Sequence, residues 1–283
     1  SPVKGKVNVI NVWEDDFTTT FGKPTKDSGT KSFLSLQAAV QALKNNKINL
    51  LVTAPINKNN IQSEKFKFPG HTDYLAQELD GDSLMFMICD ELKIGLLTDH
   101  VALKEINTHV TRQRIEQKFS LINESLKKDF GIQKPKIAVL SIDPHAGDGG
   151  VIGKDDQDIL KPVLLEIASK NNLVFGPFSS DSFFGSGQHK KYDAVLAIYH
   201  DQGLIPFKTL SFGSGVNYTA GLNKVRTSPD HGTGYDIAGK GLADSTSFKN
   251  AIFSAIEIFK SRKLFEDLNK NPLNLSNSKT AKK

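Results

Sequence analysis

Three histidines stand directly after apolar runs that are typical of buried strands. His100 lies in DHVAL after IGLLT, His145 in DPHAGDGG after KIAVLSI, and His200 in YHDQGL after AVLAIY. Imidazoles from separate strand ends can converge on one divalent ion and leave a coordination position open, which a catalytic metal site requires. A histidine after a strand is also commonly a hydrogen-bonding or capping residue. The pattern by itself leaves both interpretations open.

A second group of side chains is suited to binding an anion. His71 and Thr72 follow a glycine in GHTDYL, where the missing side chain lets the backbone approach a ligand closely. An imidazole, a hydroxyl and nearby backbone N–H groups suit a phosphate or a carboxylate, and an ordinary turn is the alternative. In the neighbouring segment VTAPINK, Lys58 can be interpreted as a solvated lysine.

The Gly- and Ser-rich stretch 205–226 carries three more such residues, Lys208, Asn217 and Arg226. Lysine supplies a point charge and arginine a planar fork for anionic oxygens. A basic exposed loop explains the same composition. The next stretch, 228–244, contains four glycines and suits a loop that wraps a ligand. No G-x-G-x-x-G motif follows a strand here, so the sequence does not predict a Rossmann domain.

Secondary structure must position these residues. Along the chain, short apolar runs alternate with amphipathic patterns. Strands are predicted over 49–55, 84–89, 94–98, 136–142 and 194–199. Helices are predicted over 33–46, 111–130, 157–171 and 247–261. Such alternation predicts an α/β fold with a parallel or mixed sheet flanked by helices. In sheets of that kind ligands bind at the carboxyl ends of the strands, where the polar motifs lie.

The composition of the 283 residues is that of an ordinary globular protein, with 38% hydrophobic and 24% charged residues. No apolar run is long enough to span a membrane, and the single cysteine, Cys89, excludes an internal disulfide. We therefore expect a cytoplasmic protein. Much of the net charge of +5 lies in the polar stretch 267–283, predicted to be a disordered tail after one catalytic unit over 1–266. The remainder gives no reason to expect nucleic-acid binding.

Seven motifs together resemble the 4-hydroxythreonine-4-phosphate dehydrogenase family. VTAPINK, PGHTDYL, DHVAL, DPHAGDGG, YHDQGLIPFK, GVNYTAGL and VRTSPDHGT occur in the family's order and span about residues 34–262. The loop HGTGYDIAGKGLAD also resembles the adenosine-binding loop of isopropylmalate and isocitrate dehydrogenases. The resemblance implies the two-lobed fold of those enzymes, with two interleaved lobes around a cleft.

The resemblance also implies roles for individual residues. His100, His145 and His200 match the ligands of one divalent ion per subunit, and imidazole favours Zn²⁺ or Co²⁺ over Mg²⁺. In the family this site lies at the interface of a homodimer and takes ligands from both chains. The substrate-contacting positions match His71, Thr72, Lys208, Asn217 and Arg226. The expected NAD-binding residues are Gly232, Asp236 and Gly239.

The activity that the resemblance implies is NAD-dependent oxidation of 4-phosphooxy-L-threonine, with decarboxylation to 3-amino-2-oxopropyl phosphate, in pyridoxal phosphate biosynthesis. Lys208 is the expected proton-transfer residue and Asp201 the alternative. Related enzymes oxidise 4-phosphothreonate or phosphoerythronate in sugar-acid breakdown, and the anion-binding set would serve either kind of substrate. A metal-dependent hydrolase and a non-catalytic phosphate-binding protein are the other classes considered.

The beginning of the chain departs from the family pattern. Family members start with a strand and a glycine-rich segment of the type GDPxGIGPE, and this sequence shows neither. The expectation is therefore a sheet that lacks the family's first strand. Unpaired backbone groups at that position would be exposed at the sheet edge.

Overall fold

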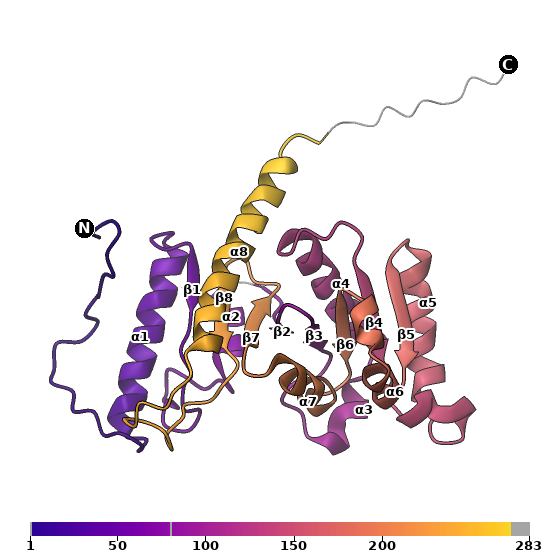
Figure 1. The fold of residues 1–283 in the computed structure, drawn as a ribbon, viewed down its shortest axis with the longest axis horizontal. Helices are drawn as coiled ribbons and strands as arrows, with labels where there is room; N and C mark the ends of the chain where they lie inside the picture. Colours follow the sequence, from indigo (N-terminus) through magenta and orange to yellow (C-terminus); the bar gives the residue numbers. More distant parts are fainter. Residues whose placement is uncertain (1, 80, 273–283) are drawn as a thin grey trace.

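A single mixed β-sheet forms the centre of the molecule in the computed structural model, which describes residues 2–79 and 81–272. The strand order is β1-β8-β7-β2-β3-β6-β4-β5 (Figure 1). In chain order the strands are β1 (Leu50–Val52), β2 (Leu84–Ile88), β3 (Lys93–Leu96), β4 (Lys136–Leu140), β5 (Leu173–Phe178), β6 (Ala194–Ala197), β7 (Val216–Ala220) and β8 (Val225–Pro229). The prediction of an α/β fold with a mixed sheet is confirmed.

Helices cover the sheet. They are α1 (Lys26–Lys44), α2 (His71–Glu78), α3 (Ile106–His109), α4 (Arg112–Lys128), α5 (Lys161–Ser169), α6 (Ser180–Gly185), α7 (His200–Ser211) and α8 (Thr246–Leu268). Helix α1 packs beside β1 at one end of the sheet and α5 beside β5 at the other (Figure 1). Helix α4 has the expected amphipathic pattern: Thr111 caps its first turn, and Ile115, Phe119 and Ile122 are buried.

Strands β3, β6, β4 and β5 run parallel to one another, so their carboxyl ends meet at one edge of the sheet. Side chains alternate between the two faces, as strand geometry requires. In β6, for example, Val195 packs on the side of α7 whereas Leu196 packs on the side of α4 and α5. This alternation explains why these strands are apolar throughout. The expected division into two lobes stays a prediction.

Several elements were not predicted. The stretch 205–226, interpreted as a loop, contains the end of α7, all of β7 and the start of β8. Pro206 lies within α7 and several glycines lie between the elements, so the local signals of a turn concealed them. Strand β5 contains Pro177, which is tolerated because β5 is at the sheet edge. Strand β1 is at the opposite edge.

The C-terminal part differs slightly from expectation. Helix α8 continues to Leu268, two residues into the stretch predicted as a tail, and residues 273–283 of that prediction lie outside the described residues. No described helix is both long enough and apolar enough to cross a membrane.

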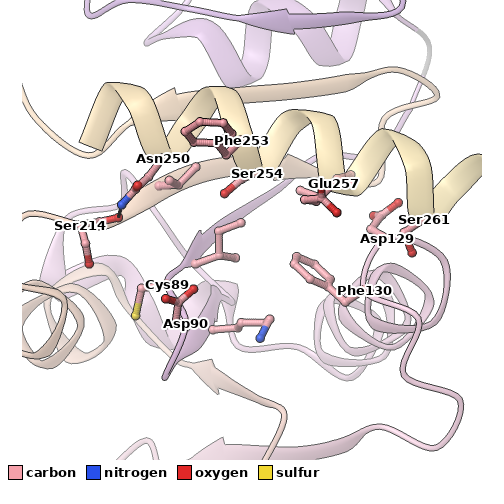
Figure 2. Close-up of a pocket in the computed structure, with 14 residues that line it drawn as sticks. Cys89, Asp90, Asp129, Phe130, Ser214, Asn250, Phe253, Ser254, Glu257 and Ser261 are labelled. Atoms are coloured by element: carbon pink, nitrogen blue, oxygen red, sulfur yellow. Dashed lines mark hydrogen bonds between the residues drawn. The ribbon is translucent and has the colours of Figure 1, made fainter. Parts of the chain in front are cut away.

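A cavity of about 560 Å³ opens beside α8, at the end of the sheet where β3 begins. Its walls combine apolar side chains such as Phe130 and Phe253 with acidic ones such as Asp90 and Glu257 (Figure 2). Cys89 also lines it, and burial raises the pKa of this thiol, as expected for an unreactive cysteine. None of the residues predicted to do chemistry lies here.

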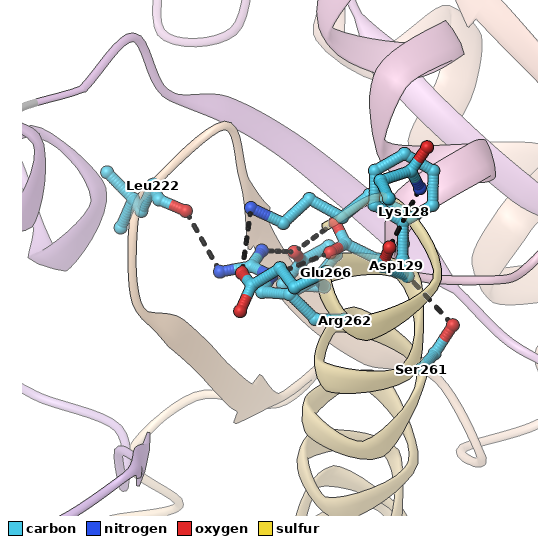
Figure 3. Close-up of polar contacts among 9 residues, drawn as sticks. Lys128, Asp129, Leu222, Ser261, Arg262 and Glu266 are labelled. Carbon is cyan, nitrogen blue, oxygen red and sulfur yellow. Dashed lines mark hydrogen bonds and ion pairs between the residues drawn. The ribbon is translucent and has the colours of Figure 1, made fainter. Parts of the chain in front are cut away.

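Next to this cavity a buried polar network ties three elements together (Figure 3). Arg262 of α8 donates from Nε to Asp129 at 2.9 Å and from Nη2 to the Tyr218 hydroxyl of β7 at 2.8 Å. Tyr218 in turn donates to Asp129, which follows α4, at 2.6 Å. Burial, and then the charge of Asp129, hold the pKa of Tyr218 well above its usual range. All the charges are therefore paired or hydrogen-bonded, as burial requires.

We predict that Arg262→Met destabilises the fold strongly. Removing one partner of a buried ion pair leaves Asp129 charged and unpaired, which costs about 3–5 kcal/mol. Urea denaturation followed by circular dichroism measures the free energy of unfolding. Lys260→Met is the matched control, because Lys260 pairs with Glu257 on the exposed side of the same helix and exposed pairs contribute about 0–1 kcal/mol. Equal losses for the two variants would contradict the importance of the network.

Candidate active site

His100 and His200 lie side by side at the carboxyl ends of β3 and β6. Their ring centroids are 5.9 Å apart. The two strand ends are joined by the Thr98 hydroxyl, which donates to the carbonyl of Ile198 at 2.7 Å. Nδ1 of His200 is 2.7 Å from the Asp201 carboxylate. A donor bond from Nδ1 leaves the Nε2 lone pair of His200 free to bind a cation.

His145 lies apart from this pair. It follows β4 in a short turn, Pro144–Gly150, whose residues 145–149 have left-handed backbone angles. The Asp156 carboxylate holds the turn by accepting the backbone N–H groups of Ile142 and Asp143 at 2.9 and 2.8 Å. His145 lines a cavity with Asp143 and Asp181, whereas His100 and His200 line another. Within the described residues of one chain, no group of three or more His, Cys, Asp or Glu side chains could hold a metal ion.

The structure adds Lys58 to the site, although the sequence suggested only a solvated lysine. Its Nζ is 3.4 Å from Nε2 of His100. Burial lowers the pKa of His100, and the charge of Lys58 lowers it further. A neutral imidazole is the form that ligates metals, so His100 and His200 fit two ligands of a divalent ion. The position of Lys58 in the motif VTAPINK was the only signal of its role.

His71 and Arg226, both expected to bind an anion, lie close enough for the charge of Arg226 to act on His71. His71 is the first residue of α2, where free backbone N–H groups favour an anion, and Thr72 is the next. Burial, together with the charges of Arg226 and Lys58, lowers the pKa of His71 to about 3. Arg226 is only 2% exposed, so the interpretation of its stretch as a basic exposed loop is wrong. The cause is that β8 is an interior strand.

Lys208 and Asn217 contribute from α7 and β7. Lys208 Nζ is 3.4 Å from a carboxylate oxygen of Asp230, a residue that sequence reasoning did not select. Burial raises the pKa of Asp230, although Lys208 opposes that shift. The buried Oδ1 of Asn217 accepts no hydrogen bond from the described residues. A buried acceptor without a donor is costly, so this oxygen fits a ligand that brings a donor.

The glycine-rich loop predicted to bind a nucleotide borders a separate cavity of about 260 Å³. Thr233 and Tyr235 line one side of it, and residues 17–23 line another. Gly239 has φ +76°, and a Cβ there would lie 3.1 Å from the Phe21 ring; Gly232 has open space around it. Asp236 is exposed, and no hydrogen bond to its carboxylate is found among the described residues.

Comparisons with known proteins identify the family of the chain. The model of the family "Pyridoxal phosphate biosynthetic protein PdxA" matches residues 1–255. The chain belongs to the PdxA family. It is 45% identical to 4-hydroxythreonine-4-phosphate dehydrogenase of Bacteroides thetaiotaomicron over 95% of this chain and 74% of that protein. The expected family is confirmed.

Solved structures place this PdxA-family chain in the expected fold. The 4-hydroxythreonine-4-phosphate dehydrogenase of Klebsiella pneumoniae superposes with a TM-score of 0.74 at 34% identity, over 84% of this chain and 72% of that one. The isocitrate dehydrogenase of Methylococcus capsulatus superposes with a TM-score of 0.51 at 13% identity, over 86% and 77%. The second likeness concerns the fold alone. It confirms the expected isocitrate dehydrogenase-like architecture of PdxA.

The depressed pKa of His71 makes stability depend on pH. Between pH 6.5 and about 3 the unfolded chain binds a proton at this residue that the folded chain excludes. The contribution of His71 to stability is complete above pH 6.5 and decreases as the pH falls, by at most about 1.4 kcal/mol per pH unit. We predict that His71→Asn has a flatter profile of unfolding free energy between pH 6.5 and 4.5. Parallel profiles for the variant and the wild type would show that His71 titrates normally.

Proposed function

We propose that this chain oxidises 4-phosphooxy-L-threonine with NAD and a divalent metal ion and decarboxylates the product to 3-amino-2-oxopropyl phosphate, in pyridoxal phosphate biosynthesis. The observation that carries the proposal is the neighbourhood of buried Arg226, His71 and Lys58 next to an imidazole pair. The charges of Arg226 and Lys58 both act on His71, and Lys58 contacts His100. A phosphorylated hydroxy acid presents both an anion and a metal-binding hydroxyl. The name of the Bacteroides relative supports the same substrate.

The side chains of one chain suit two distinct tasks. Arg226, His71 and the first turn of α2 would bind the phosphate, because a neutral imidazole and backbone N–H groups can donate to it. His100, His200 and His145 would hold the metal ion. When bound, a divalent ion lowers the pKa of a coordinated hydroxyl and stabilises negative charge on oxygen, and NAD accepts hydride.

Proton transfer remains assigned to Lys208, with Asp201 as the alternative. Lys208 is half-exposed and pairs loosely with Asp230, so its ammonium group can turn towards a substrate. The Asp201 carboxylate is engaged with Nδ1 of His200, a contact that orients the imidazole. This difference favours Lys208.

The metal set needs a second copy of the chain. His100 and His200 are neighbours, whereas His145 lies in a different cavity of the same chain. A C₂ homodimer, the commonest closed assembly, would bring His145 of one copy to the imidazole pair of the other. The expected homodimer with a shared active site is therefore part of the proposal.

Complementation between inactive variants tests the shared site. His145→Ala and His200→Ala should each abolish NADH formation from 4-phosphooxy-L-threonine. After subunit exchange in an equimolar mixture, half of the dimers are mixed and each contains one intact site, so about a quarter of the wild-type activity should return. NADH absorbance is the measurement, and mass spectrometry verifies exchange. Exchange without recovered activity would exclude the shared site; a wild type active only on 4-phosphothreonate would change the substrate and leave the site unaffected.

Asp236 should determine the choice of cofactor. A carboxylate can accept hydrogen bonds from both ribose hydroxyls of NAD and repels the 2′-phosphate of NADP. Asp236→Ala should reduce the NAD/NADP ratio of kcat/KM about tenfold or more, since charge-assisted hydrogen bonds contribute about 1.5–3 kcal/mol. Asp244→Ala is the control, because the Asp244 carboxylate accepts the backbone N–H of Thr246 at the start of α8. An unchanged ratio in Asp236→Ala would reject the role.

A further inference from the structure

Arg226 carries a positive charge into the interior of the sheet, and no carboxylate of the described residues pairs with it. Its side chain is among the largest that are fully buried, and its hydrogen-bond partners among the described residues are all hydroxyl oxygens. Burial lowers the pKa of this guanidinium to about 9, so it is still charged at neutral pH. Buried charges in proteins are normally paired. The absence of a partner within the described chain leaves the charge available to a bound anion.

Two threonine hydroxyls hold the guanidinium. Thr53 Oγ1 accepts from Nε at 3.0 Å and from Nη2 at 2.6 Å. Thr219 Oγ1 accepts from Nη1 at 3.0 Å. A guanidinium has five N–H donors in a fixed plane, so one hydrogen on Nη1 and one on Nη2 remain. Because Thr53 occupies the Nε–Nη2 edge, the remaining Nη2 hydrogen points towards the Nη1 side of the plane.

The two threonines are themselves held by the sheet. Thr53 follows β1, and its backbone N–H donates to the carbonyl of Thr227 at 3.0 Å while its carbonyl accepts from the Ser228 hydroxyl at 3.1 Å. Thr219 is an interior residue of β7, fully buried. Arg226 is on β8, which lies between these two strands. The β-branched side chains have few accessible rotamers, so the strand register sets where both hydroxyls point.

We propose that Thr53 and Thr219 are positioning residues that aim Arg226 at the oxyanion of the substrate. Neutral hydroxyls orient the guanidinium without neutralising it, whereas a carboxylate at either position would pair with Arg226 and compete with the ligand. The remaining donors on Nη1 and Nη2 are the ones that an anionic oxygen can engage. This inference rests on the proposed function, because it takes the substrate phosphate as the anion.

The test replaces the Thr53 hydroxyl by a methyl group. Thr53→Val removes the acceptor of two Arg226 donors at nearly constant volume. It should raise KM for 4-phosphooxy-L-threonine about ten- to hundredfold, the value of a hydrogen bond to a charged group, and change kcat less than about threefold, because binding distant from the reacting carbon is uniform. Thr53→Ser keeps the oxygen and should restore KM to within about threefold of wild type. Thr219→Val should act in the same direction, with a smaller rise.

Thr227→Val is the matched control. Thr227 is equally buried and is the neighbour of Arg226 on β8, but its hydroxyl donates to the carbonyl of Ala251 at 2.7 Å and does not touch Arg226. Its KM should stay at the wild-type value even if its melting temperature falls. A rise in KM for Thr227→Val as large as for Thr53→Val would show general loosening of the sheet and overturn the proposal, as would a wild-type KM in Thr53→Val.

Stabilisation by inorganic phosphate separates this inference from the proposed function. Phosphate that binds only the folded wild type should raise its melting temperature, and Thr53→Val should lose most of that rise while Thr53→Ser and Thr227→Val keep it. If the wild type shows this pattern but forms no NADH from 4-phosphooxy-L-threonine, the function fails and the positioning role holds. If the wild type is active and Thr53→Val keeps both its KM and the phosphate effect, the positioning role fails and the function holds.

Discussion

A charged arginine inside a β-sheet is the constraint on which the site depends. Moving such an ion out of water costs several kcal/mol even after the protein relaxes, and Arg226 recovers part of this cost only through neutral hydroxyls. Burial, and then the charge of Arg226, lower the pKa of His71, so the neighbouring imidazole is neutral and can donate a hydrogen bond. An anion bound here would contact the charge of Arg226 and neutral hydrogen-bond donors such as His71.

Contacts on the other face of the sheet hold β7, the strand that carries Thr219 and Asn217. On β7, Tyr218 points into the buried network with Arg262 and Asp129, whereas its neighbours Asn217 and Thr219 point to the other face. A shift of one residue in β7 would exchange these faces. The network therefore specifies the register in which Thr219 reaches Arg226 and in which Asn217 presents its free oxygen. The buried ion pair of Arg262 and Asp129 is thus linked through β7 to Thr219 and Asn217, which belong to the expected ligand-binding region.

The positions of the three histidines have a different physical cause. Parallel strands β3 and β6 are adjacent, so the residues after them, His100 and His200, meet without any special backbone conformation. His145 follows β4, on the other side of β6, in a left-handed turn held by Asp156. Since β4 is as close to β6 as β3 is, the turn and not the sheet order separates this third imidazole from His200. Within one chain the expected anion-binding residues His71 and Arg226 therefore lie close together, whereas the three imidazoles lie in two places.

Much of this protein could be predicted from local patterns. The apolar runs that became β2, β3, β4 and β6, the amphipathic helix α4 and the strand-end positions of the three histidines all depend on near neighbours in sequence, whose periodicity reports directly on backbone conformation. The motifs also identified the family correctly. Strands β7 and β8 were missed because the glycines and serines around them resemble those of a loop.

Tertiary structure alone decided how the polar residues combine. Thr53, Thr219 and Arg226 meet because β1, β8 and β7 are neighbours in the sheet. Lys58 reaches His100 across 42 positions of sequence, and His145 is separated from both other histidines. The sequence left open whether Arg226 binds an anion or lies in an exposed loop, and the fold makes it an interior charge with no counter-anion among the described residues. The physical reason is that composition and periodicity describe a residue and its local backbone, whereas charge pairing and desolvation depend on strand order, which long-range packing sets.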